Sequence, residues 1–222
     1  MKIIKYLAVV PARKNSKRIK NKNLIKIKGK TLINITLDSL NKVNKIKYII
    51  VSSDSKKILQ IANRYEKVLL INRPKSLCFD NSKSEDAIIH AVNYLEKNNF
   101  KIQNIILLQV TSPLRTAKDI LNCIKVYEKK RLNSIFSVYS SKDFIWEKRG
   151  RAKKSISYNF KKRIITQKLK PLFFENGAIY IFNKKKFLKQ KNRIIEPFDF
   201  FLMPKYRSID IDTKEDFLIL KK

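Results

Sequence analysis

Two carboxylates near the C-terminal end of the sequence have the spacing of a metal site. Asp210 and Asp212 flank Ile211, and in an extended segment residues two apart point the same way. Both carboxylates can therefore face one Mg²⁺ ion, which prefers oxygen ligands. The alternative is a strand end at which Asp212 caps the final helix. Acids are scarce in this chain, with 18 Asp and Glu against 51 Lys and Arg, and this scarcity favours the metal site.

A loop rich in cations follows the first apolar run of the chain. Residues 6–10 predict a short buried strand that stops at Pro11. The cations singled out in the ten positions from 13 to 22 are Arg13, Lys17, Arg18, Lys20 and Lys22. Cations fixed at the carboxyl end of a strand can hold a triphosphate and stabilise the charge of its transition state. Ser16 and Asn23 can add hydrogen bonds. The loop is not a Walker loop, because it lacks the GxxxxGK[ST] pattern.

Two further polar blocks each adjoin an apolar run. Gln109 to Arg115 follow the run 105–108, so their polar groups can project into the same crevice, although a plain turn before Pro113 is the alternative. Asn176 precedes the run 178–182. An Asn-Gly pair is first a turn signal, and an amide aimed at a polyhydroxylated substrate is an equal alternative.

The sequence does not indicate histidine or cysteine chemistry. His90, the only histidine, lies on a predicted helix and is expected to be structural. A general base must then be a carboxylate or a metal-bound hydroxide. Cys78 and Cys123 lack CxxC spacing, so we expect buried thiols rather than a zinc site or a disulfide.

Alternating strands and helices must position these residues. Apolar runs predict strands at 6–10, 48–51, 68–71, 105–108, 134–139 and 178–182. Helical periodicity predicts helices over 58–65, from Ser82 or Ser84 to about 95, from Thr116 to about 130, and after Thr213. This alternation predicts the α/β class, with a mainly parallel twisted sheet and helices on both faces.

The weakly periodic region around Trp146 interrupts this alternation. We therefore expect residues 1–139 to form a nucleotide-binding core, 140–171 an insertion, and 172–222 a return to the core that carries the Asp pair. A tryptophan in such a segment often needs a partner to bury it. The insertion is accordingly expected to be a dimerisation element, and a mobile surface excursion is the alternative.

The formal charge of +33 suggests a polyanion as partner. The lysines are nevertheless scattered through every segment, which favours a compositional bias over a specific nucleic-acid surface. No run approaches the roughly 18 apolar residues of a membrane helix. We therefore expect a cytoplasmic protein that binds neither membranes nor specific nucleic acids.

Four blocks together resemble the acylneuraminate cytidylyltransferases, the CMP-sialic acid synthetase family, on its nonulosonate branch. The blocks are Pro11-Ala12-Arg13-x-x-Ser16-Lys17-x-x-x-x-Lys22-Asn23-Leu24, Leu108-Gln109-x-Thr111-Ser112-Pro113-Leu114-Arg115, Asn176-Gly177-Ala178-Ile179-Tyr180-Ile181 and Asp210-Ile211-Asp212-Thr213. The resemblance implies a Rossmann-like nucleotidyltransferase that joins CTP to a nonulosonic acid with Mg²⁺, giving CMP-sugar and pyrophosphate. Alternatives are a cytidylyltransferase for the Kdo sugar and a basic nucleic-acid-binding protein without catalysis.

The resemblance also implies a role for each matching residue. Arg13, Ser16, Lys17 and Lys22 would hold the triphosphate, with Arg13, Lys22 and Asp212 as the catalytic residues. Asn23, Arg73, Ser82 and Ser84 would surround the cytidine, Gln109 and Asn176 would orient the sugar, and Asp210 and Asp212 would hold Mg²⁺. The family typically dimerises through an excursion placed like residues 140–171. The chain departs from many relatives at Lys14-Asn15, where they carry glycines, and matches loosely over 163–167.

Overall fold

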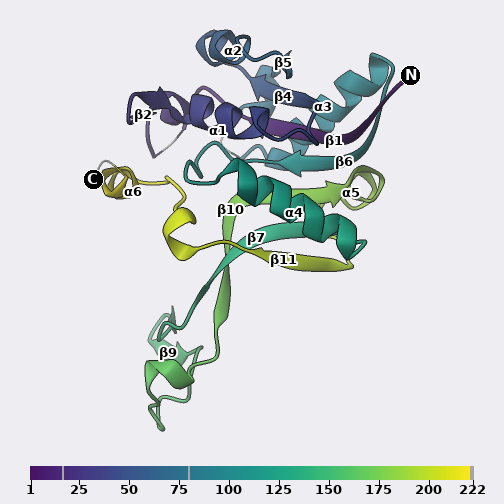
Figure 1. Ribbon diagram of the computed structural model, residues 1–222. Helices are drawn as coiled ribbons and strands as arrows, with labels where there is room; N and C mark the ends of the chain where they lie inside the picture. Colours follow the sequence, from purple (N-terminus) through teal and green to yellow (C-terminus); the bar gives the residue numbers. More distant parts are fainter. Residues whose placement is uncertain (17, 80, 221–222) are drawn as a thin grey trace.

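A seven-stranded sheet forms the centre of the protein. The computed structural model describes residues 1–16, 18–79 and 81–220. The strands follow the order β11-β7-β10-β6-β1-β4-β5 (Figure 1). Their bounds are β1 (Lys2–Pro11), β4 (Tyr48–Ser53), β5 (Val68–Asn72), β6 (Phe100–Leu107), β7 (Ser134–Ser141), β10 (Leu172–Asn183) and β11 (Phe198–Leu202).

The sheet is mainly parallel, as the alternation of strands and helices predicts. β1 pairs in parallel with β4 and β6, β4 with β5, and β11 with β7, whereas β10 runs antiparallel to both of its neighbours. The central strands carry continuous apolar runs such as residues 7–10 and 105–107, which are almost completely buried. A strand covered on both faces needs such a run.

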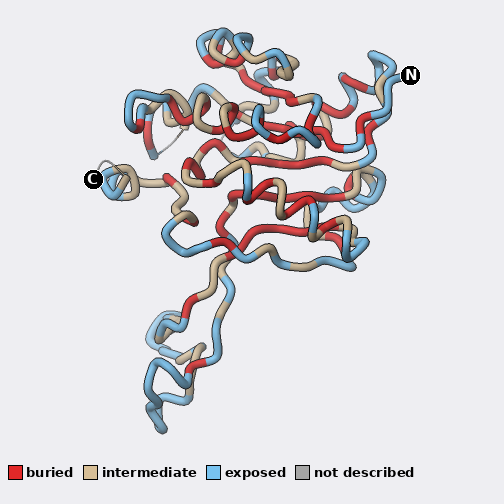
Figure 2. Tube along the Cα trace, viewed as in Figure 1, coloured by how far each residue is buried: buried red, intermediate tan, exposed pale blue. Residues whose placement is uncertain are grey.

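Helices cover both faces of the sheet and so confirm the predicted fold class. α1 (Leu32–Asn41), α2 (Lys56–Ala62) and α4 (Ala117–Lys129) pack into one apolar core, and α3 (Ser84–Lys97) and α5 (Lys184–Gln190) into the other. Figure 2 shows the buried strands between these layers. The short helix α6 (Lys214–Ile219) follows the Asp pair.

Two of the three predicted helix caps are confirmed. Thr116 accepts a hydrogen bond from the N–H of Asp119, and Thr213 accepts one from the N–H of Asp216. The prediction that Ser82 or Ser84 caps α3 is wrong, because Lys83 occupies the N-cap position. The carboxylate of Asp86 accepts from the Lys83 N–H instead.

Several elements were not predicted from the sequence. They are α1, α5, β11, the small ladders β2 (Lys26–Ile27) with β3 (Lys30–Thr31) and β8 (Trp146–Arg149) with β9 (Ala152–Ser155), and the 3₁₀ turns η1 (Lys22–Leu24), η2 (Lys75–Leu77), η3 (Thr166–Lys168) and η4 (Lys205–Arg207). The helix predicted over 58–65 lies at Lys56–Ala62, since Ser55 supplies its N-cap.

The segment between β7 and β10 extends from the body as an arm, with β8 and β9 near its far end (Figure 1). It is mostly exposed (Figure 2). The predicted boundaries at 140 and 171 lie beside the ends of β7 and β10. The predicted division into a nucleotide-binding core (1–139), an insertion (140–171) and a C-terminal part of the core (172–222) remains a prediction.

Among the described residues, no helix is both long and apolar enough to cross a membrane. Both cysteines are free thiols. Cys123 is buried as expected, whereas the expectation for Cys78 is wrong because that residue is only partly buried. Cys78 follows the exposed turn η2, where the chain runs over the surface.

Candidate active site

A cavity of about 230 Å³ lies where β1 and β6 end. Its lining includes eight of the predicted site residues: Arg13, Ser16, Lys22, Asn23, Arg73, Ser82, Ser84 and Gln109. Five residues without an individually predicted role complete the lining, namely Pro11, Asn15, Lys83, Val110 and Thr111. Lys17, predicted to hold phosphate, lies outside the described residues. The carboxyl ends of parallel strands thus gather side chains from distant parts of the chain.

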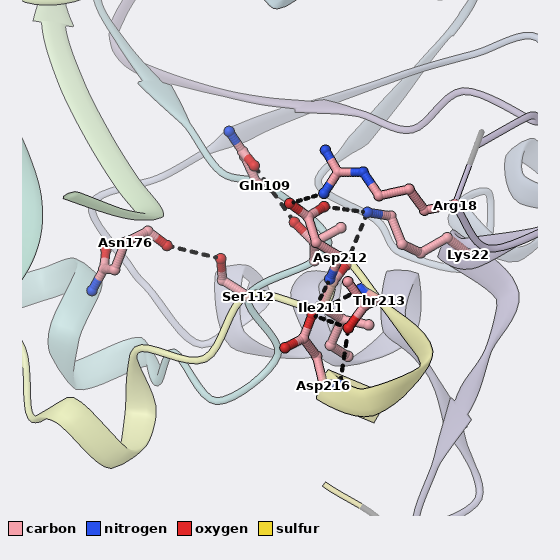
Figure 3. Close-up of polar contacts among 10 residues, drawn as sticks. Arg18, Lys22, Gln109, Ser112, Asn176, Ile211, Asp212, Thr213 and Asp216 are labelled. Atoms are coloured by element: carbon pink, nitrogen blue, oxygen red, sulfur yellow. Dashed lines mark hydrogen bonds and ion pairs between the residues drawn. The ribbon is translucent and has the colours of Figure 1, made fainter. Parts of the chain in front are cut away.

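The cation loop contacts the C-terminal carboxylates directly. Lys22 Nζ donates to Asp212 Oδ1 at 2.9 Å and to the Ile211 carbonyl at 2.9 Å. Arg18 Nη1 lies 2.6 Å from Asp212 Oδ2. Figure 3 shows both cations pointing at this one carboxylate. The two ends of the sequence therefore meet beside the cavity.

The pKa values of the two carboxylates are shifted in opposite directions. Burial alone would raise the pKa of Asp212, but hydrogen bonds and charges from Lys22 and Arg18 outweigh it and hold that pKa below its usual value. Burial raises the pKa of Asp210, and the charge of Asp212 adds to this, against a hydrogen bond from Thr111 and the charge of Lys22. The ionised form of Asp210 is therefore less favourable in the folded protein than in water.

The Asp pair fits a divalent cation by its chemistry. Within the described part of the chain, Oδ1 of Asp210 is buried without a hydrogen-bond partner. Asp212 already receives two cationic side chains. The described residues hold no group of three or more His, Cys, Asp or Glu side chains suited to a metal. Mg²⁺ commonly binds through one or two carboxylates, with water and phosphate oxygens completing its shell.

Two arginines at the cavity are held in defined positions. Arg73 is buried and donates to the Ser52 hydroxyl at 3.1 Å and the Ser52 carbonyl at 2.7 Å. Burial lowers the pKa of its guanidinium. Arg13 donates to the Phe79 carbonyl at 2.9 Å, and Asn23 donates to the Arg13 carbonyl at 2.8 Å.

Gln109 lies between a buried arginine and a glycine. Arg115 Nη1 donates to the carbonyls of Gln109 at 3.1 Å and Ala178 at 2.8 Å, and burial lowers the pKa of Arg115 to about 10. A Cβ on Gly177 would lie 3.4 Å from Gln109 Oε1, and the φ of Gly177 is +69°. The positive φ favours glycine at position 177, and a Cβ there would lie in van der Waals contact with the Gln109 side chain.

Asn176 is not among the residues that line the cavity. Its side chain is buried and contacts Ser137, Ala178, Met203 and Ser208. Figure 3 shows its backbone carbonyl linked to Ser112. The sugar-orienting role implied for Asn176 stays a prediction, while the structure shows these four protein contacts.

The sequence pattern assigned Arg115, Thr111 and Lys83 no individual role, although the block from Gln109 to Arg115 was expected to project polar groups into the crevice. The signals were present, because Thr111 and Arg115 belong to the polar block after β6 and Lys83 lies between two predicted ligands. Arg115 differs from the many solvated cations of this chain by its burial, since it is 3% exposed, and burial cannot be read from the sequence pattern.

Comparisons with known proteins extend these observations. Residues 7–221 match the model of a family described as cytidylyltransferase. The chain is 29% identical to an N-acylneuraminate cytidylyltransferase of Streptococcus agalactiae serotype V, over 97% of this chain but 52% of that protein. It is 28% identical to a pseudaminic acid cytidylyltransferase of Campylobacter jejuni serotype O:2, over 96% and 93% of the two chains. The chain therefore spans about half the length of the streptococcal relative.

Several solved structures share this fold, and one of them serves as an example. It is a CMP:2-keto-3-deoxy-manno-octonic acid synthetase complexed with CTP, with a TM-score of 0.67, 15% identity and coverage of 98% of this chain and 97% of the other. At this identity the likeness concerns the fold alone.

Proposed function

The chain belongs to the cytidylyltransferase family, and on that premise we propose that it transfers the cytidylyl group of CTP to a nonulosonic acid sugar. The relatives named for N-acylneuraminate and pseudaminic acid support this substrate class. The main supporting observation is the cavity at the strand ends, which collects the cation loop, Arg73 and Gln109 beside the Asp pair.

The proposed reaction forms one bond and breaks one. The oxygen of the anomeric hydroxyl bonds to the α-phosphorus of CTP, and the bond from that phosphorus to the bridging oxygen breaks. Pyrophosphate leaves, and the hydroxyl proton passes to water or to a carboxylate. Arg13 and Lys22 would hold the triphosphate and offset its growing negative charge, with Ser16 adding a hydrogen bond. We keep the same role for Lys17.

The nucleoside would lie against the other wall of the cavity. Asn23, Arg73, Ser82 and Ser84 all line it, and we propose that they surround the cytidine. Arg73 suits this task because Ser52 holds its guanidinium in place, so little side-chain entropy is lost when a ligand binds. Gln109 is proposed to orient the sugar.

Asp210 and Asp212 would hold Mg²⁺, and Asp212 is proposed to be catalytic. When bound, the ion supplies positive charge beside the phosphates. Lys22 contributes to the same arrangement, because it ties Asp212 to the cation loop while lining the cavity itself.

The arm carries an apolar surface that supports a homodimer. Trp146 packs against Tyr158 and Phe160, yet remains 47% exposed, and Ile165 is 60% exposed. Exposed apolar clusters of this kind mark interaction surfaces. We propose that a second copy of the chain covers the arm, with a cytoplasmic location where CTP is available. A Trp146→Glu variant is expected to sediment as a monomer, and an unchanged dimer would contradict this role of the arm.

An assay of pyrophosphate release tests the function. The protein is incubated with Mg²⁺, CTP and, in turn, N-acetylneuraminic, legionaminic and pseudaminic acids and Kdo, and then with ATP, GTP or UTP in place of CTP. We expect turnover with CTP and at least one nine-carbon acid. Turnover with Kdo alone would place the substrate in the eight-carbon class, and no turnover with any sugar would refute the function.

A further inference from the structure

Asn176 lies where the pairing of β10 with β7 is interrupted. The register between these strands shifts between Glu175 and Tyr180. Asn176 Oδ1 accepts from the Ser137 hydroxyl at 2.6 Å and from the Ala178 N–H at 3.1 Å. Because a backbone N–H can only donate, this contact determines which end of the amide is the oxygen. The nitrogen must then face the other way.

That nitrogen contacts the segment that leads to the Asp pair. Asn176 Nδ2 donates to the Ser208 hydroxyl at 2.9 Å and contacts Met203 Sδ at 3.6 Å. The Ser208 hydroxyl in turn donates to the Pro204 carbonyl at 3.0 Å. Ser208 precedes Asp210 by two residues, so the amide of Asn176 holds the chain just before the first carboxylate.

The segment from 208 to 212 lies outside any helix or strand. Its position therefore depends on individual hydrogen bonds rather than on a ladder. On the other side of Asp210, the Ile211 N–H donates to the Thr111 carbonyl at 2.8 Å. Asp210 is thus held between two anchors, one at Ser208 and one at Ile211.

We infer that Asn176 is a positioning residue that acts through Ser208 to hold Asp210 in its metal-binding place. It is 5% exposed, and its amide already has two hydrogen bonds on its oxygen and a hydrogen bond and a sulfur contact on its nitrogen. A sugar hydroxyl could reach it only by displacing one of these buried partners. The inference rests on the proposed function, because it assigns Asp210 to the metal.

Binding of Mn²⁺ separates this role from contact with the sugar. Affinity for Mn²⁺·CTP is measured by water-proton relaxation without sugar, on Asn176→Ala, Ser208→Ala and the double variant. Loss of groups that orient metal ligands typically weakens metal binding about 10–100-fold. We expect about tenfold weaker binding in each variant, a double variant no weaker than the singles, and a sugar KM within about twofold of the native value.

Ser39→Ala is the matched control. Ser39 is a buried serine that donates to the Thr36 carbonyl at 2.8 Å within α1, so its loss should leave Mn²⁺ affinity unchanged. Circular dichroism checks that each variant folds. Ser208→Ala is the milder change, because it keeps the contacts of Asn176 to Ser137 and Ala178, and it carries the test if Asn176→Ala does not fold.

Three outcomes would overturn the inference. One is a large rise in sugar KM for Asn176→Ala with Mn²⁺ affinity unchanged, which would make Asn176 a sugar ligand. Another is native Mn²⁺ affinity in Ser208→Ala, and the third is no Mn²⁺·CTP binding by the native protein. If the native protein binds Mn²⁺·CTP but forms no CMP-sugar, the proposed function fails while the positioning role is still measured.

Discussion

Replacing Asp210 with asparagine should stabilise the protein while removing its activity. Burial raises the pKa of Asp210, and neighbouring Asp212 and Asp216 add to this effect against Thr111 and Lys22. Oδ1 of Asp210 is also buried without a hydrogen-bond partner in the described part of the chain. The ionised carboxylate therefore lowers the stability of the metal-free protein, and Asp210→Asn removes that charge.

The pH dependence has a definite sign. A carboxyl whose pKa is raised in the folded state does not lower folding stability below its unfolded pKa of about 3.9. Above its folded pKa it lowers folding stability by the full amount. The stability gain of Asp210→Asn should therefore be absent near pH 4 and grow toward neutral pH. A buried polar atom without a partner costs roughly 1–3 kcal/mol. We expect a gain of about 1 kcal/mol, because the amide itself stays buried.

With metal and nucleotide bound, the native protein should become more stable than Asp210→Asn. A ligand at ten times its Kd stabilises the folded state by about 1.4 kcal/mol. The native protein should gain this amount from Mg²⁺ and CTP, whereas Asp210→Asn should gain less than about 0.4 kcal/mol, so that its advantage of about 1 kcal/mol is lost. For a chain of this length 1 kcal/mol corresponds to roughly 2–4 °C in Tm.

The assay is thermal unfolding at pH 4 and pH 7, with and without Mg²⁺ and CTP. Asp199→Asn is the matched control, because Asp199 forms an ion pair with Lys130 and has a lowered pKa, with the Lys130 hydrogen bond as its main cause. This control should show no gain at pH 7 and a native response to Mg²⁺. The reasoning is refuted if Asp210→Asn is less stable than the native protein at pH 7 without metal.

Three other substitutions test neighbouring parts of the site. Asp212→Asn should remove most pyrophosphate release while costing only about 1 kcal/mol of stability, because the ion pair with Arg18 is exposed and contributes little, and the asparagine oxygen can still accept from Lys22; near-normal turnover would exclude a metal role for Asp212. Gly177→Ala forces a positive φ on a residue with a Cβ, so it should lower the free energy of unfolding by about 1–2 kcal/mol. The new Cβ would lie 3.4 Å from Gln109 Oε1, so the sugar KM should rise if Gln109 orients the sugar. A native KM would contradict that role. Arg115→Met removes the donor that Arg115 gives to the Ala178 carbonyl and leaves the Gln109 carbonyl only the 3.5 Å contact from the Ser112 N–H. It should lower the free energy of unfolding by about 3 kcal/mol, measured as a lower urea midpoint, and an unchanged midpoint would contradict this.

The sequence predicted the central strands well because their signal is strong. The run 105–108 and the strand 6–10 are continuously apolar, and a chain buried on both faces needs such a run. α1 was missed because its β-branched residues, Ile33, Ile35 and Thr36, weaken the helical pattern, although Thr31 caps it by accepting from the Asn34 N–H. β11 was missed because aromatic Phe198 and Phe200 alternate there with only partly buried residues.

The site was predicted as a set of residues but not as a set of contacts. Separate polar blocks indicated Arg13, Lys22 and Gln109, and the structure brings them to one cavity. Pattern alone could not separate Asn176 from Gln109, since both are amides beside apolar runs. Burial and the break in strand pairing distinguish them, and these depend on tertiary packing rather than on local sequence.

The most direct test of the central claim is the stoichiometry of the products. The native protein is given CTP, Mg²⁺ and one nonulosonic acid at a time, and CMP-sugar is measured by mass spectrometry beside pyrophosphate by a coupled assay. We predict one CMP-sugar for each pyrophosphate with at least one nine-carbon acid. Pyrophosphate released equally without sugar, or no CMP-sugar with any of the acids, would contradict cytidylyl transfer.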